Sequence, residues 1–266
     1  MKEVFVEGFG VSVGKRSERL VVKRKGEVVF ERPFFDVERV IVATGGATIS
    51  AAAIQECVKH GIPMEFLSFS GAPYASLVSP NLGGTVRTRR EQLLAYEDRR
   101  SVELGKAFAV GKLKNSASIL KYFAKYRKEA DRRTYDFLYR RVDRIEELVR
   151  LVDGVEGGCA DEVRGALLNA EGRGAALYWE GVGRLVPAFP GREGRGSEDL
   201  VNSMLNYGYG ILYHRVLSAV TRAGLDPFAG YVHTDRPGKP SLVLDLIEEF
   251  RGQVVDRTVL GMLGTG

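Results

Sequence analysis

The most constraining feature of this sequence is a change in hydrophobic periodicity near residue 85. Before the stretch Asn81-Leu82-Gly83-Gly84, apolar side chains alternate or form short runs, whereas after it they recur every three or four residues. The first pattern is typical of strands, the second of amphipathic helices, and a glycine-rich stretch is typical of a linker. We therefore expect an α+β protein of two domains, a small β-rich one over residues 1–85 and a larger all-helical one over residues 86–266.

The N-terminal domain is expected to contain strands and one embedded helix. Short β-rich segments lie at Val4–Val6, Val11–Val13, Leu20–Lys23, Val28–Phe30, Val37–Ala43 and Met64–Phe69. The segment Ser50–His60 has a serine in a capping position, an alanine-rich body and Gly61 directly after it. This combination predicts a helix.

The C-terminal domain carries a clear apolar stripe and a loop rich in glycine, proline and arginine. The stripe has spacings of three and four residues, which predict the buried face of a helix: Tyr135, Leu138, Val142, Ile145, Val149 and Val152. Asp161 is expected to cap the next helix. The loop Pro187–Gly196 leads into another helix, predicted from Asp199 to Arg222.

Charge is unevenly distributed along the chain. The whole sequence has a net charge of +5, but residues 87–150 alone hold 18 basic and 10 acidic side chains, a net +8. Such a segment attracts a phosphate backbone, although charges on helices more often form a plain solvated face. Charge alone therefore favours a solvated helix face over a DNA-binding surface.

The cysteines and the apolar runs indicate in which cellular compartment the protein is expected. Cys57 and Cys159 are the only cysteines and lie far apart, which argues against a disulfide framework and against a cysteine zinc site. No apolar run has the length needed to cross a bilayer, and the first residues lack the apolar core of a signal peptide. We expect a cytoplasmic protein with no membrane partner.

One acidic residue lies on an otherwise apolar line of a predicted helix, Asp161–Trp179. Glu171 follows Leu167 by four residues and should point inward with it. Burying a carboxylate is costly unless it is paired or bound to a metal. For this residue taken alone, a salt bridge to Arg173, to Arg184 or to an arginine of another helix is the favoured interpretation.

A second acidic cluster follows a histidine. His233 precedes a helix that starts at Pro240, and Asp245 and Glu248 are three residues apart, so both carboxylates share one face of that helix. Two carboxylates and one imidazole suit Mg²⁺ or Mn²⁺ better than structural zinc. Spacing leaves an equal alternative, in which Asp245 supports the helix, Glu248 and Glu249 are solvated and His233 is a satisfied loop histidine.

A polar and aromatic stripe is predicted on the helix Asp199–Arg222. Its members follow one another at spacings of four, three and four residues: Asn202, Asn206, Tyr209 and Tyr213. This face could contact phosphates or stack on bases, or it could pack on a neighbouring helix. Arg192 and Arg195 in the preceding loop favour phosphate slightly.

These segments resemble the CRISPR-associated spacer integrases, the universal adaptation nuclease family (Cas-one). The match runs in order along nearly the whole chain, through four stretches: Gly14–Lys23, Ile49–Ser68, Asn169–Tyr178 and Val201–Arg251. It includes Asn169-Ala170-Glu171-Gly172, Gly230-Tyr231-Val232-His233 and the run Asp245–Arg251. No Walker loop, H-E-x-x-H or G-x-S-x-G motif is present, which excludes those enzyme classes.

The resemblance implies a fold, a metal site and partners. It implies a β-rich domain for dimerisation and partner contacts, and a helical catalytic domain in which Glu171, His233 and Glu248 bind the metal. Asp245 falls at the family's accessory acidic position and joins them as a catalytic residue, and Tyr178 is grouped with the DNA-binding candidates. Family members form asymmetric homodimers, bridged by a small ferredoxin-like adaptation partner. They usually continue for several more helical segments, so the resemblance also implies a catalytic domain that is short at its C-terminus.

The expected function is therefore metal-dependent integration of short prespacer duplexes into the repeat of a CRISPR array, with endonuclease activity where water attacks instead. A stand-alone structure-selective nuclease acting on branched DNA is the alternative enzyme. A non-catalytic DNA-binding scaffold, whose +8 segment binds DNA and whose acidic cluster is structural, is the alternative of another class. A mini-array substrate separates the first two, and metal dependence separates both from the third.

Overall fold

The computed structural model describes residues 2–68, 71, 73–77, 79, 85–194 and 196–263. The chain divides into two compact units, Met1–Gly83 and Gly84–Gly266. The expected linker over residues 81–84 and the end of the predicted strand at Phe69 lie outside the described residues.

The N-terminal unit contains two four-stranded sheets and one α-helix. The strands are β1 (Lys2–Val6), β2 (Val11–Arg16), β3 (Arg19–Arg24), β4 (Glu27–Pro33), β5 (Val37–Val42), β6 (Thr48–Ile49), β7 (Met64–Leu67) and β8 (Pro73–Leu77). One sheet has the order β1-β5-β7-β8 and the other β4-β3-β2-β6. A short 3₁₀ helix η1 (Phe34–Asp36) precedes β5, and α1 (Ala51–Lys59) follows β6.

The predicted patterning explains this unit. In β2, Val11 and Val13 are buried and their neighbours are not, as expected of a strand with one face in the core. The side chain of Ser50 accepts a hydrogen bond from the backbone N–H of Ala53, so the predicted helix cap is confirmed. The β-rich unit with one α-helix is therefore as the sequence indicated.

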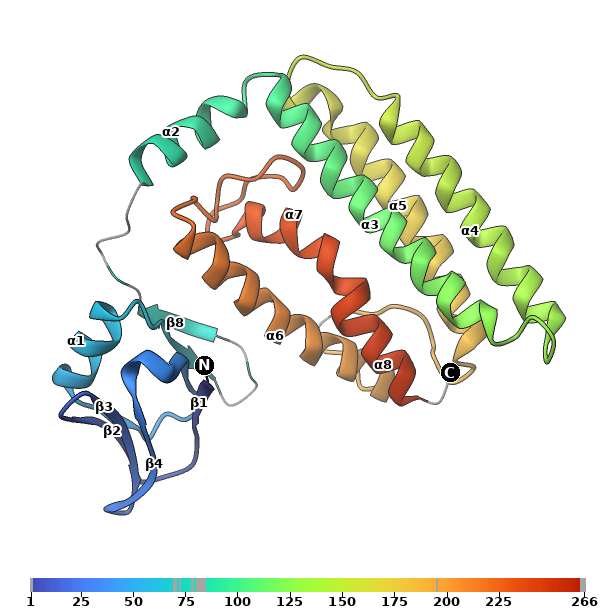
Figure 1. Ribbon diagram of the computed structural model, residues 1–266. Coiled ribbons are helices and arrows are strands. Elements are labelled where there is room, and N and C mark those ends of the chain that lie inside the picture. Colours follow the sequence, from blue (N-terminus) through green and yellow to red (C-terminus); the bar gives the residue numbers. More distant parts are fainter. Residues whose placement is uncertain are drawn as a thin grey trace. The chain divides into compact units, whose positions relative to one another are not determined.

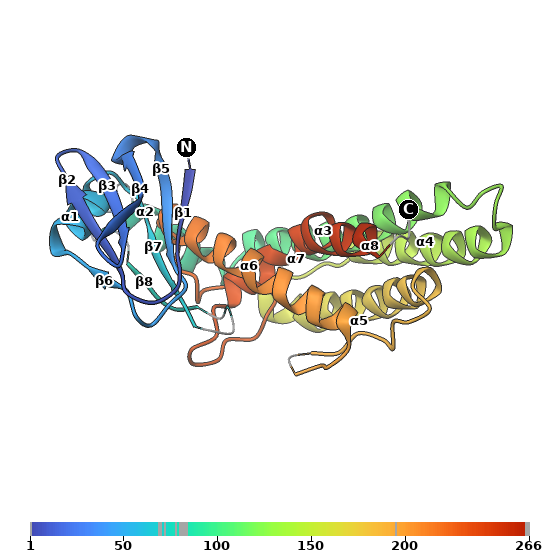
Figure 2. The same ribbon diagram turned by 90° about the horizontal axis from the view of Figure 1, so that it is seen from below.

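The C-terminal unit is helical throughout its described elements. These are α2 (Thr85–Ala95), α3 (Arg99–Lys125), α4 (Arg132–Asp153), α5 (Ala160–Leu185), α6 (Leu200–Arg222), α7 (Ser241–Phe250), the π-helical turn η2 (Arg251–Asp256) and α8 (Arg257–Met262). The three long helices α3, α4 and α5 pack side by side (Figure 1). Helix α7 packs on both α3 and α6, and Figure 2 shows α8 continuing along the line of α7.

Two sequence features set this packing. The predicted stripe of α4 faces the core, with Leu138, Val142 and Ile145 fully buried. In α5, Gly174 lies so close to α3 that a Cβ there would come within 2.1 Å of a Leu113 methyl group. A glycine in the middle of a helix costs stability, and here it permits the close approach of the helix that carries Glu171.

One cap prediction was wrong. Helix α5 begins at Ala160 with Cys159 at the cap position, and Cys159 makes no side-chain capping bond. Asp161 instead lies in the first turn, where its carboxylate accepts hydrogen bonds from Tyr96 and Arg164. Within the described residues, no helix is both long and apolar enough to cross a membrane.

Candidate metal centre

Three separate elements bring two carboxylates and one imidazole together. Glu171 comes from the middle of α5, Glu248 from α7, and His233 from the loop between α6 and α7. One potential ligand atom from each lies within 4.8 Å of the others. Helix α3 packs against both α5 and α7, so this arrangement rests on the helical core.

The imidazole of His233 is held by Asp245. Its Nδ1 lies 2.7 Å from Oδ1 of Asp245, and that carboxylate also accepts the backbone N–H groups of Tyr231, Val232 and His233 at 2.6, 3.0 and 2.8 Å. We infer that Nδ1 carries the proton, because it faces a carboxylate oxygen, which can only accept from it. Nε2 is then the ring nitrogen left to bind a metal, an arrangement common among histidine ligands.

A glycine allows the histidine loop to pass over the start of α7. A Cβ on Gly230 would lie 2.6 Å from the carbonyl carbon of Ser241 and 2.7 Å from Oδ2 of Asp245. The backbone N–H of Gly230 donates to Oγ of Ser241 at 3.0 Å, and Ser241 is fully buried. The loop is therefore fixed on the helix that carries Asp245 and Glu248.

Two basic side chains neutralise the carboxylates. Nζ of Lys112, from α3, lies 2.5 Å from Oε1 of Glu171 and 2.8 Å from Oε2 of Glu248. Arg251 pairs with the other oxygen of Glu248. Burial alone would raise the pKa of Glu248, but Lys112 and Arg251 outweigh it and hold that pKa below its usual value. Burial likewise opposes the charge on Lys112, yet Glu248 and Glu171 raise the pKa of its ammonium group.

These residues fit a divalent metal ion. Glu248 is 5% exposed. Its Oε2 forms an ion pair with Lys112 but accepts no hydrogen bond. The ammonium of Lys112 shows that a cation is accommodated between the two carboxylates. Carboxylate oxygens with one imidazole nitrogen are donors that suit Mg²⁺ or Mn²⁺.

A pocket of about 200 Å³ adjoins this centre. Its lining includes three cations, three aromatic side chains and two acids: Lys112, Arg192, Arg251, Tyr178, Trp179, Tyr209, Glu248 and Asp256. The π-helical turn η2 directly follows the helix of Glu248 and supplies both Arg251 and Asp256. Such turns within helices often occur at functional sites.

Asp256 binds two tyrosines beside the pocket. Its carboxylate is 4% exposed and accepts hydrogen bonds from the hydroxyls of Tyr178 at 2.8 Å and Tyr209 at 2.5 Å. Burial raises the pKa of Asp256 to about 6, although the two hydroxyls and Arg251 act in the opposite direction. Burial also raises the pKa of both tyrosines, so both remain neutral donors.

The two asparagines of the predicted stripe on α6 bind an arginine of the preceding loop. Asn202 is fully buried and, with Asn206, binds the guanidinium of Arg192 at 2.9 and 2.7 Å. The side chain of Asn202 therefore holds the loop, and a contact of Asn202 with DNA stays a prediction. The guanidinium of Arg192 lies over the rings of Trp179 and Tyr209.

Two further residues, Tyr213 and Arg195, were predicted to bind DNA. Tyr213 is half-buried, packs against the helical core and stands edge-on to His214, as the helix-packing alternative expected. Arg195 lies outside the described residues.

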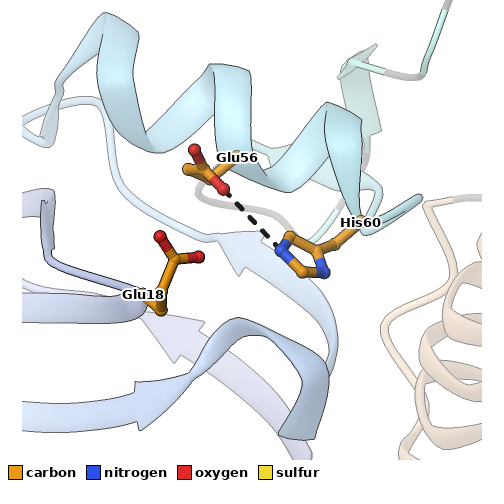
Figure 3. Close-up of side chains that lie close together, drawn as sticks. All are labelled: Glu18, Glu56 and His60. Carbon is orange, nitrogen blue, oxygen red and sulfur yellow. Dashed lines mark ion pairs between the residues drawn. The ribbon is translucent and has the colours of Figure 1, made fainter.

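A second group of potential ligands occurs in the N-terminal unit. Glu18, Glu56 and His60 lie close together there, as Figure 3 shows. Glu56 already binds Lys15 at 2.7 Å and Lys59 at 3.5 Å, so two lysines balance the two acids. The ring of His60 stacks on Phe34. Nε2 of His60 also lies 3.7 Å from Oε2 of Glu56, the contact dashed in Figure 3, so these side chains are already paired with one another and the group is best explained as a structural ion-pair cluster.

Sequence reasoning missed three members of the site. The favoured partners of Glu171 were Arg173, Arg184 or an arginine of another helix, whereas the partner is a lysine of another helix, Lys112, 59 residues earlier in the chain. Lys112 lies in the segment with the net charge of +8, and that excess was the only available signal. Arg251 was part of the matched run without a role, and nothing in the sequence singled out Asp256.

The whole chain is similar to proteins of one family. A family model described as CRISPR associated protein Cas1 matches residues 4–266. The CRISPR-associated endonuclease Cas1 1 of Archaeoglobus fulgidus is 40% identical over 267 residues, which cover 97% of this chain and 77% of that protein.

Solved structures agree in fold. A casposase bound to an integration product is 26% identical with a TM-score of 0.77, covering 100% of this chain and 74% of that one. A Cas6-RT-Cas1–Cas2 complex contains a chain that is 18% identical with a TM-score of 0.75, covering 100% of this chain and 28% of that one. The expected α+β fold is confirmed by these neighbours and by the elements described above.

Proposed function

This chain belongs to the CRISPR-associated Cas1 family, and we propose that it is a divalent-metal-dependent DNA strand transferase and endonuclease that inserts short spacers into a CRISPR array. The observation that supports this most strongly is the convergence of Glu171, His233 and Glu248 within 4.8 Å. A casposase bound to its integration product shares the fold at 26% identity.

The proposed reaction is a transesterification. The 3′-hydroxyl oxygen of the incoming strand forms a bond to the phosphorus of the target strand, and the bond from that phosphorus to the target's 3′-oxygen breaks. The proton lost by the attacking hydroxyl balances the one gained by the leaving oxygen, so no co-reactant is needed. If water attacks instead, the same site acts as an endonuclease.

The role of each residue follows from its surroundings. Glu171, His233 Nε2 and Glu248 would hold Mg²⁺ or Mn²⁺, which when bound supplies positive charge at the reacting phosphate. Asp245 orients His233 and keeps its Nδ1 protonated. Arg192 and Arg251, which line the adjoining pocket, are placed to bind phosphate oxygens, and Arg guanidinium groups suit that task.

The partners and domain roles are also proposals. We propose that the segment over residues 87–150 with the net charge of +8 contacts the DNA backbone, which would give binding a strong salt dependence. The solved Cas6-RT-Cas1–Cas2 complex supports Cas2 as the partner, and the family resemblance supports both its small ferredoxin-like form and a homodimer built through the N-terminal domain. Because a CRISPR array is chromosomal, we place the protein in the cytoplasm.

The test uses a mini-array DNA and a short duplex with free 3′ ends, in the presence of Mn²⁺ or Mg²⁺. Wild type should give joined products, and both EDTA and His233→Ala should abolish them while duplex binding stays nearly unchanged. His214→Ala is the matched control, since His214 is the buried histidine of α6 and does not belong to the metal cluster. Normal joining by His233→Ala would contradict the proposal.

The alternatives give different products in the same assay. Cleavage of branched DNA without joining would identify a stand-alone nuclease. Binding that is indifferent to metal, without any reaction, would identify a scaffold.

A further inference from the structure

Lys112 occupies the position that a metal ion would need. Its Nζ bridges Oε1 of Glu171 and Oε2 of Glu248, at 2.5 and 2.8 Å. Both oxygens belong to the residues that would bind the metal. An ammonium group and a divalent cation cannot share them at these distances, because like charges so close repel strongly in a buried site.

The lysine belongs to the core of the unit. Lys112 extends from α3, which packs on both α5 and α7, the helices of Glu171 and Glu248. Its side chain is 21% exposed, against 13% for Glu171 and 5% for Glu248. An ion pair this enclosed is screened less by salt than a surface pair.

The charges around the site show what displacement of this lysine requires. Glu171, Glu248 and Asp245 supply three negative charges there, and Lys112 and Arg251 supply two positive ones. A divalent ion would replace the ammonium as the partner of the two glutamates. The displaced ammonium would then face the adjoining pocket, which Lys112 lines together with Arg192 and Arg251.

That pocket would then hold three cations. Its other acid, Asp256, accepts hydrogen bonds from Tyr178 and Tyr209 and lies near enough to Arg192 and Arg251 for both to lower its pKa. Three cations against that one carboxylate leave a net positive charge that attracts a further anion, and a DNA phosphate is the anion that the proposed function supplies. The metal and the phosphate would each favour the binding of the other.

We propose that Lys112 is a built-in competitor for the metal, released by DNA, so that metal and DNA bind cooperatively and the centre loads its metal mainly on a substrate. This inference rests on the proposed function, because it takes the three residues as metal ligands and DNA as the source of the phosphate. By linkage, the factor by which DNA tightens metal binding equals the factor by which metal tightens DNA binding.

The experiment is a Mn²⁺ titration of the full chain, with free Mn²⁺ measured by electron paramagnetic resonance. It is run without DNA and with a duplex whose 3′ ends are dideoxy-terminated, so that no joining occurs. Wild type should bind Mn²⁺ about tenfold more tightly with the duplex, within the usual range of such couplings. Equal affinity with and without duplex overturns the inference.

The variant Lys112→Met separates the effect of the lysine on metal binding from the effect of the phosphate. It is needed because a phosphate oxygen of the duplex could also bind the metal directly. Without DNA, this variant should bind Mn²⁺ about tenfold more tightly than wild type, and the duplex should add less than it adds to wild type. Lys112→Arg keeps the charge and should bind Mn²⁺ as weakly as wild type. Lys121→Met is the control, because Lys121 lies on the same helix but pairs with Glu146 of α4.

The outcomes separate this inference from the proposed function. Metal binding that His233→Ala leaves unchanged would refute the metal centre itself. Metal binding that depends on His233 but is the same in wild type and folded Lys112→Met would refute only the role of Lys112. If Lys112→Met does not fold, Lys112→Gln, which removes the charge but keeps a polar side chain, takes its place with the same expected gain of about tenfold without DNA.

Discussion

Asp256→Asn is the most informative perturbation of stability, because it removes a buried charge beside the pocket. Burial raises the pKa of Asp256 from 3.8 to about 6. One pKa unit corresponds to about 1.4 kcal/mol, so at neutral pH the ionised carboxylate costs the folded state about 3 kcal/mol. An acid with a raised pKa contributes more stability as the pH falls from its folded pKa towards its unfolded pKa.

The sign and size of the pH effect follow. At about pH 7.5 Asp256 is ionised in both states, whereas at about pH 4.5 it is protonated in the folded state only. Between these conditions wild type should gain about 2 kcal/mol of unfolding free energy relative to Asp256→Asn.

The assay is urea unfolding of both proteins at the two pH values. The quantity compared is the difference in unfolding free energy between wild type and Asp256→Asn, taken at each pH. Other titrating groups affect both proteins alike, and any rearrangement of the Tyr178 and Tyr209 hydroxyls in the variant contributes at both pH values. A stability difference that does not change with pH would refute the assignment of a raised pKa to Asp256.

Three further predictions concern packing, orientation and DNA. Gly174→Ala should lower stability by about 1–3 kcal/mol through overpacking against Leu113, whereas Gly172→Ala, with open space around it, should be neutral or stabilising; thermal unfolding compares them. Asp245→Asn should weaken Mn²⁺ binding by about 10–100-fold, measured by calorimetry, because His233 loses its orienting carboxylate; unchanged affinity would exclude that role. Arg192→Ala should weaken duplex binding and reduce the slope of log affinity against log salt by about one if Arg192 contacts a phosphate, and an unaltered slope would argue against such a contact.

The fold was largely predictable because its signals are local. The alternation of Val11 and Val13, the Ser50 cap and the stripe of α4 each follow from the spacing of nearby residues. Asp161 failed as a cap because the competing bonds to Tyr96 and Arg164 come from the packing of α5, which no local pattern contains.

The site was predictable only in part because its contacts are long-range. Family resemblance brought Glu171, His233 and Glu248 together, while spacing alone left Glu171 as a salt bridge. That salt bridge exists, but with Lys112 of another helix. The acidic partners of a buried cation depend on which helices pack together, and the sequence pattern gives no direct record of that.

The α6 stripe shows a second limit. Asn202 and Asn206 have the spacing of a DNA-contacting face, yet they bind Arg192 and the loop backbone. Polar residues on one face of a helix can bind a ligand or a neighbouring segment, and spacing does not distinguish the two.

The central claim is that Glu171, His233 and Glu248 form one metal centre, and anomalous diffraction from Mn²⁺-soaked crystals of the complex with the dideoxy-terminated duplex tests it most directly. We expect an anomalous peak within bonding distance of the two glutamates and Nε2 of His233, with Lys112 displaced towards the pocket. A peak at Glu18, Glu56 and His60 alone, or Lys112 still between Glu171 and Glu248 with no peak there, would contradict it.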